Sequence, residues 1–78
     1  MQGAIVMVQI GGGSDLTGVH KDLHGVESVK EVYFLAGPTD ALCHVEAADV
    51  DAVVRTVMKI RSTKGVANTD TRFILPLH

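Results

Sequence analysis

The most restrictive feature of the sequence is its opening run, Gln2 to Ile10 (QGAIVMVQI), which carries no charge and stops at three glycines. A run of this length, rich in β-branched and apolar residues, predicts a strand. A strand with one wet face alternates polar and apolar residues, and this run barely does, so we expect both of its faces to be covered.

A membrane span needs about 20 apolar residues, so we expect no membrane segment here. No Lys or Arg precedes the run, as a signal peptide would require.

Length and composition favour one ordinary globular domain over residues 1–78. The chain is 46% hydrophobic and 21% charged, which argues against disorder. Its net charge of −2 gives no basic field for a polyanion, so we expect no direct contact with nucleic acid. The single cysteine, Cys43, excludes an internal disulfide framework and a zinc site built from several cysteines. We therefore expect no metal and no cofactor, and a cytoplasmic location.

The remaining segments predict two helices and three further strands, separated by glycine-containing turns. In chain order we expect a strand over 2–10, a helix capped by Ser14 or Asp15 with Leu16, Val19 and Leu23 on its apolar face, strands over 28–36 and 41–47 joined as a hairpin, a helix capped by Asp49 with Val50, Val53, Val54, Val57 and Ile60 on its apolar stripe, and a strand over 67–75.

This order, β-α-β-β-α-β, is typical of the α+β ferredoxin-like fold. In that fold an antiparallel sheet carries both helices on one face and leaves the other face bare. Here the bare face would still present apolar side chains from the first two strands. An exposed apolar sheet on so small a domain indicates a contact surface, so we expect a sheet-to-sheet homodimer.

Two segments resemble the Lrp/AsnC family of feast/famine regulators. The segment 28–40 (SVKEVYFLAGPTD) is similar to a family pattern in which Val29, Glu31, Gly37 and Asp40 match, and 64–71 (KGVANTDT) is similar to the entry into the family's last strand. The similarity covers nearly the whole chain and corresponds to the family's effector-binding half, the RAM domain. The chain opens directly with the first strand, so it resembles a stand-alone RAM protein without a helix-turn-helix.

The resemblance implies a non-catalytic module that senses a small molecule, usually an amino acid, and joins as dimers into a larger ring. A full-length regulator of the same family is an implied partner. The implied pocket lies between dimers, and an aspartate there suits an ammonium group while threonine hydroxyls donate or accept hydrogen bonds. Many relatives carry an aromatic residue where this chain has Thr39, and Asp70 is left out because its side chain should face the other way. The ligand-binding residues carried over are Gly37, Pro38, Thr39, Asp40, Thr69 and Thr71.

Two other functions compete with a sensing module. The first is a small dimeric ferredoxin-like enzyme of monooxygenase or isomerase type, which needs a convergent acid, base or nucleophile. His44 and Tyr33 show no such pattern, so we expect no enzyme. The second is a purely structural assembly protein whose pocket has degenerated.

Other residues that could carry chemistry have simpler interpretations. His20 and His24 are four residues apart on a helix, but no third metal ligand is near in sequence, so we expect two surface residues. Cys43 and His44 are neighbours in a strand and point to opposite faces, which prevents a nucleophile-base pair and suggests a buried, inert thiol. The glycines 11–13 lack a complete phosphate-binding motif, so we expect a flexible connector.

Overall fold

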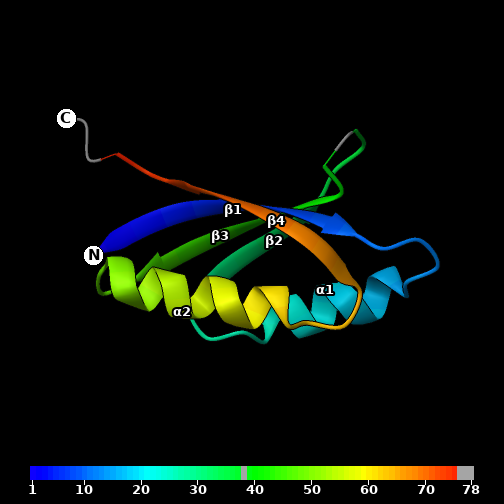
Figure 1. Ribbon diagram of the computed structural model, residues 1–78, viewed down its shortest axis with the longest axis horizontal. Coiled ribbons are helices and arrows are strands. Elements are labelled where there is room, and N and C mark those ends of the chain that lie inside the picture. The colour runs from blue at the N-terminus through cyan, green and yellow to red at the C-terminus, as the bar shows by residue number, and fades with distance from the viewer. Residues whose placement is uncertain (38, 76–78) are drawn as a thin grey trace.

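The computed structural model describes residues 1–37 and 39–75, and these form the expected β-α-β-β-α-β order (Figure 1). The α+β ferredoxin-like fold is thereby confirmed. The second strand ends two residues earlier than expected, and the last strand begins one residue earlier and ends two residues earlier. The elements are β1 (Gln2–Ile10), α1 (Leu16–His24), β2 (Val29–Phe34), β3 (Ala41–Ala47), α2 (Val50–Arg61) and β4 (Val66–Phe73).

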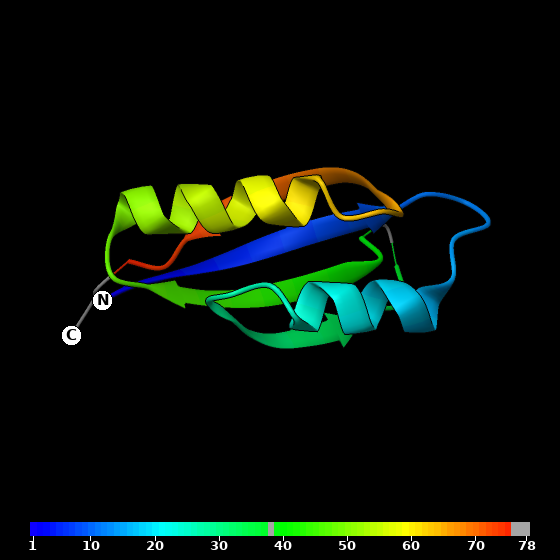
Figure 2. The same ribbon diagram turned by 90° about the horizontal axis from the view of Figure 1, so that it is seen from below.

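The four strands form one antiparallel sheet in the order β2-β3-β1-β4. The uncharged β1 therefore occupies an interior position, whereas β2 and β4 are the two edges. Both helices cover the same face of this sheet (Figure 2). α1 packs on β2, and α2 packs across β3, β1 and β4. No helix within the described residues is long and apolar enough to cross a membrane.

The core lies between the sheet and the two helices and consists mainly of small side chains. Leu23 from α1 and Ile60 from α2 are fully buried against the sheet. The hydroxyl of the buried Thr56 donates to the carbonyl of Ala52 at 3.0 Å, so its polar atom is satisfied. The sheet contributes residues that are 0% exposed: Ala4, Val6, Val8, Ala41, Cys43 and Val45.

The apolar stripe predicted for α2 is only partly correct. The helix buries Val53 and Ile60, but Val50 and Val54 remain 49% and 48% exposed. The helix lies across the last strand of the sheet, so its outer flank has no further strand to cover it. In α1, Leu16 was expected on the buried face and is 53% exposed.

The two helix starts differ in how they are capped. Asp49 caps α2 as predicted, because its side chain accepts the backbone N–H of Ala52 at 2.8 Å. Asp15 occupies the cap position of α1, but its side chain makes no capping hydrogen bond, so that expectation is wrong. The Asp15 carboxylate instead lies over Gly18, where a Cβ would stand 2.9 Å from Oδ2.

The face of the sheet opposite the helices is bare in the single chain. Ile5, Met7 and Leu42 are half-buried on this face, and Tyr33 is 50% exposed beside them. The expectation that both faces of β1 are covered is thus met on the helix side by the chain itself. On the bare face it stays a prediction about an additional protomer.

Candidate functional site

Hydrogen bonds from Asp40 connect the end of β1 to the segment that links β2 and β3. Its backbone N–H donates to Val8 at 3.1 Å, and its carbonyl accepts from Leu35 at 2.9 Å. Its carboxylate Oδ2 accepts the N–H of Ile10 at 2.8 Å. The side chain thus fixes the end of β1 against the connection between β2 and β3.

The same aspartate lines an open cavity of about 310 Å³ at this end of the sheet. Asp40 Oδ1 has no hydrogen-bond partner in the described part of the chain. The backbone N–H groups of Gly12 and Gly13 also donate to no protein acceptor there. The cavity is therefore lined by a carboxylate with one unpaired oxygen, by two glycines whose amides have no acceptor among the described residues, and by apolar side chains. Its remaining lining residues are Ile10, Gly11, Ser14, Leu16, Phe34 and Leu35.

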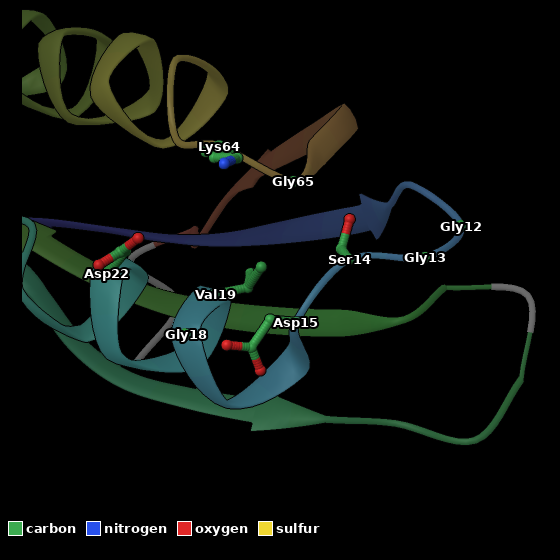
Figure 3. A pocket seen from close by; sticks show the side chains of 9 residues that line it. All are labelled: Gly12, Gly13, Ser14, Asp15, Gly18, Val19, Asp22, Lys64 and Gly65. Carbon is green, nitrogen blue, oxygen red and sulfur yellow. The ribbon is translucent and has the colours of Figure 1, made fainter.

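The glycine connector also borders a second cavity, of about 380 Å³, on its other side (Figure 3). Here Lys64, from the segment after α2, lies across from Asp15, which precedes α1, and from Asp22 of α1. Gly65 closes this region tightly, because its carbonyl accepts the N–H of Gly11 at 2.8 Å. Its φ is positive, at 96°, and a Cβ at this position would stand 2.7 Å from Val19 Cγ2, which explains why a glycine is found there.

The residues predicted for one ligand site fall in different places. Thr39 lies not with Asp40 but at a smaller cavity of about 150 Å³, which Thr69 also borders. Thr69 and Thr71 share one side of β4, as predicted. That side is the helix-covered one, since Thr69 pairs with Val8 and Thr71 with Val6. Thr71 lines neither of the cavities that contain Thr39 or Asp40.

The glycine of the predicted loop has a structural reason to be there. Gly37 adopts a φ of 148°, a conformation that residues with a Cβ rarely enter, and no atom lies within 4 Å of the position a Cβ would take. It belongs to neither cavity lining. Pro38 was also predicted to bind ligand, and it lies outside the described residues.

Three polar residues at the smaller cavity were not among the predicted site residues. Gln9, Asn68 and Asp70 line it together with Thr39 and Met7. Asp70 does face away from the helices, as the alternation along β4 required. The cavity lies on that bare face, and the only available signal was Gln9, the single polar residue on an otherwise apolar face of β1.

Cys43 and His44 lie on opposite faces of the sheet. Cys43 is fully buried on the helix side, and burial raises the pKa of its thiol to about 11. His44 lies on the opposite face, where its Nδ1 is 3.8 Å from Glu31 Oε1. Glu31 also accepts a hydrogen bond from Tyr33, and this bond raises the pKa of the phenol. Cys43 and His44 therefore form no nucleophile-base pair.

The two helix histidines lie on the surface, as predicted. The rings of His20 and His24 stack with centroids 6.0 Å apart, and His20 meets Phe34 edge-on at 5.4 Å. Among residues 1–37 and 39–75, no group of three or more His, Cys, Asp or Glu side chains is arranged to hold a metal ion.

Solved structures share this fold over nearly the full chain. A protein of Thermus thermophilus superposes with a TM-score of 0.88 at 25% identity, covering 100% of this chain and 98% of that one. A transcriptional regulator of Neisseria meningitidis, solved as a complex with L-Met, gives 0.85 at 24% identity over 95% of this chain and 49% of that one. AsnC of E. coli gives 0.86 at 20% identity over 99% and 54%.

Sequence relatives match this chain over a small part of their own length. Homocitrate synthase of Saccharolobus islandicus is 33% identical over 72 residues, which cover 92% of this chain. The homocitrate synthase of Sulfurisphaera tokodaii matches to the same extent. The chain spans only 16% of the length of these relatives.

A family model matches the chain itself. The model described as the Lrp/AsnC ligand binding domain matches residues 3–76, nearly the whole chain. The match includes both segments whose residues resembled that family and the cavities at the end of the sheet. The chain therefore belongs to the Lrp/AsnC ligand-binding domain family.

Proposed function

We propose that this chain is a non-catalytic sensing module that binds a free amino acid through Asp40. One observation carries the proposal: Asp40 lines the 310 Å³ cavity, and of its two carboxylate oxygens only the one that accepts from Ile10 has a partner among the described residues. A carboxylate with one unpaired oxygen suits the ammonium group of an amino acid. The glycine amides suit its carboxylate, and the apolar side chains suit its side chain. Membership of a ligand-binding domain family supports the same conclusion.

Each part of the ligand has a matching group in the cavity. The ammonium pairs with Asp40 Oδ1 as a charge-assisted hydrogen bond. The carboxylate accepts from the free N–H groups of Gly12 and Gly13, just before the positive end of α1. An apolar ligand side chain packs against Leu16 and Phe34. The L-Met bound by the Neisseria meningitidis regulator is a ligand of this chemical type.

Binding at this place would hold two loops of the chain together. The ligand bridges the β1–α1 connection and the β2–β3 loop, so it stabilises the native end of the sheet. We propose that two chains pack their bare faces together through Ile5, Met7 and Leu42, and that such dimers join into larger rings. A longer regulator that carries the same domain is the partner class that would convert assembly into output.

The cavity bordered by Thr39, Thr69 and Asp70 is a second candidate location. It opens on the bare face, so a second sheet packed there would enclose it. Its volume of about 150 Å³ and its single apolar lining residue, Met7, suit a smaller and more polar ligand. Asp70 already pairs with Arg72 at 3.2 Å, whereas Asp40 Oδ1 is unpaired, which favours the Asp40 cavity.

Thermal unfolding against each of the twenty amino acids tests the function. A ligand at a hundredfold excess over its Kd stabilises the native state by about 2.7 kcal/mol. In a domain of this size each kcal/mol raises the midpoint by about 4–8 °C, so binding gives a plain shift. We expect a rise for one amino acid or a few apolar ones. An unfolding midpoint that none of the twenty amino acids raises, at concentrations well above millimolar, would contradict the proposal. That result would favour a purely structural assembly role.

A further inference from the structure

The outer edge of β4 is open for pairing with another strand. β4 is the last strand of the sheet and pairs only with β1. At its end the N–H of Ile74 donates to Gly3 at 2.9 Å. In an antiparallel ladder the residues that bond to the neighbour alternate with residues that point outward. The residues whose backbone N–H and C=O groups point away from β1 are therefore Thr69, Thr71 and Phe73. No described segment lies on that outer side to accept or donate.

The edge carries two charged side chains, Asp70 and Arg72, but it lacks three other features that prevent pairing, namely proline, lysine and a bulge. From Asn68 to Phe73 the register with β1 is unbroken, and the stretch contains neither proline nor lysine. Natural edge strands are commonly blocked by such residues or by bulges. The only irregularity of β4 lies at its other end, opposite the Gln9/Ile10 step of β1. The edge is thus a regular template of six residues.

An exposed apolar stripe runs along α2 beside this edge. Val50, Val54 and Met58 are 49%, 48% and 58% exposed and recur every four residues, so they share one flank. The opposite flank carries Arg55 and Lys59, which face the connection between α1 and β2. Figure 2 shows α1 on the β2 side of the sheet and α2 on the β4 side. The flank of α2 opposite Arg55 and Lys59 therefore faces away from α1, toward the β4 edge.

The charges on β4 complement a second copy of the same strand. Antiparallel pairing centred on Thr71 sets Thr69 opposite the partner's Phe73 and Asp70 opposite the partner's Arg72. The outward-pointing residues then face one another, which the ladder requires. A shift of the partner strand by two residues sets Asp70 against Asp70 or Arg72 against Arg72. Like charges directly opposite are unfavourable, so the charges select the register centred on Thr71.

We propose that a second copy of this chain pairs with the outer edge of β4 in this register. The two four-stranded sheets then continue as one sheet, with both sets of helices on the same face. About six backbone hydrogen bonds form, two for each facing pair of outward residues. The apolar stripes of the two α2 helices meet beside the joined strands. The bare face stays open, so this interface is separate from sheet-to-sheet packing and independent of any ligand.

Amide hydrogen exchange on the assembled chain tests the pairing directly. In an isolated protomer, and equally in a dimer joined through the bare faces, the N–H groups of Thr69, Thr71 and Phe73 have no acceptor. We expect these three amides to be protected to the same extent as those of Asp70 and Arg72, which bond to β1. Rapid exchange of the three outward amides, with Asp70 and Arg72 protected, would overturn the proposal.

Charge exchange tests the register. Arg72→Asp sets the new carboxylate opposite the partner's Asp70. We therefore expect the molecular mass measured by sedimentation to halve, and the amides of Thr69, Thr71 and Phe73 to lose their protection. Asp70→Arg combined with Arg72→Asp restores opposite charges, and we expect it to restore both measurements. Lys21→Asp, the matched control on exposed α1, should change neither. Unchanged mass and exchange in Arg72→Asp, or no recovery in the double variant, would contradict the register.

Discussion

Asp40 and Cys43 lie three residues apart and differ in whether their chemistry is available. Asp40 keeps an unpaired carboxylate oxygen at an open cavity, whereas the Cys43 thiol is fully enclosed. Alternation along the strand predicted that Cys43 and His44 face opposite sides, and the usual burial of free cysteines predicted that Cys43 is the inner one. The bond from Asp40 to Ile10 was not predictable, because the two residues are 30 positions apart and meet only in the fold.

Cys43 makes stability depend on alkaline pH. Its thiol loses its proton at pKa 9.0 when unfolded and at about 11 in the fold, because burial disfavours the thiolate. Between these values the unfolded state binds fewer protons, so the free energy of unfolding should fall as pH rises. The slope is about 1.4 kcal/mol per pH unit, present in the wild type and missing in Cys43→Ala. Denaturant unfolding between pH 8 and 11, as a difference between the two proteins, checks this, and equal slopes would contradict it.

At the scale of elements, the hydrophobic patterns predicted all six segments but not which flank of each helix is covered. Val50 and Val54 have helical spacing with Val53, yet the sheet ends beneath them. Coverage depends on strand order, which the local pattern does not contain. Similarly, both Asp15 and Asp49 precede helices, but only Asp49 caps one, because the Asp15 carboxylate lies over Gly18.

The two aspartates give a matched pair of cap variants. Asp49→Ala removes an acceptor for the Ala52 N–H and should lower the free energy of unfolding by about 1 kcal/mol. Asp15→Ala removes no capping bond, so we expect a much smaller change. Chemical denaturation of both variants measures the contrast. Equal losses would show that the helix starts are capped alike.

An alanine substitution at Gly65 tests how tightly the loop after α2 is packed. The same substitution at Gly12, in the connection between β1 and α1, is the control. Gly65→Ala places a Cβ 2.7 Å from Val19 in a positive-φ conformation, which alone costs about 1–2 kcal/mol. The crowding against Val19 adds to this loss. Gly12→Ala meets nothing within 4 Å, so it should be close to neutral. Thermal unfolding midpoints of the two variants provide the comparison, and a neutral Gly65→Ala would refute the close packing.

At the scale of the whole molecule, element order was enough to predict the ferredoxin-like fold, and two short segments were enough to predict the family. The candidate site was less predictable. Thr39 and Asp40 are adjacent in the loop between β2 and β3, but they border separate cavities. The glycines 11–13, expected to be only a connector, line the same cavity as Asp40. Such convergence depends on how loops from different strands meet.

The most direct test compares Asp40→Asn and Asp70→Asn with the wild type in the thermal panel of twenty amino acids. Asparagine keeps an oxygen for the Ile10 N–H, so Asp40→Asn removes the charge and preserves the hydrogen bond that orders the strand ends. Asp70→Asn makes the same change at the smaller cavity. We predict that the wild type and Asp70→Asn share a ligand-dependent rise in midpoint, and that Asp40→Asn loses it. An undiminished rise in Asp40→Asn would contradict the central claim that Asp40 holds the ligand's ammonium.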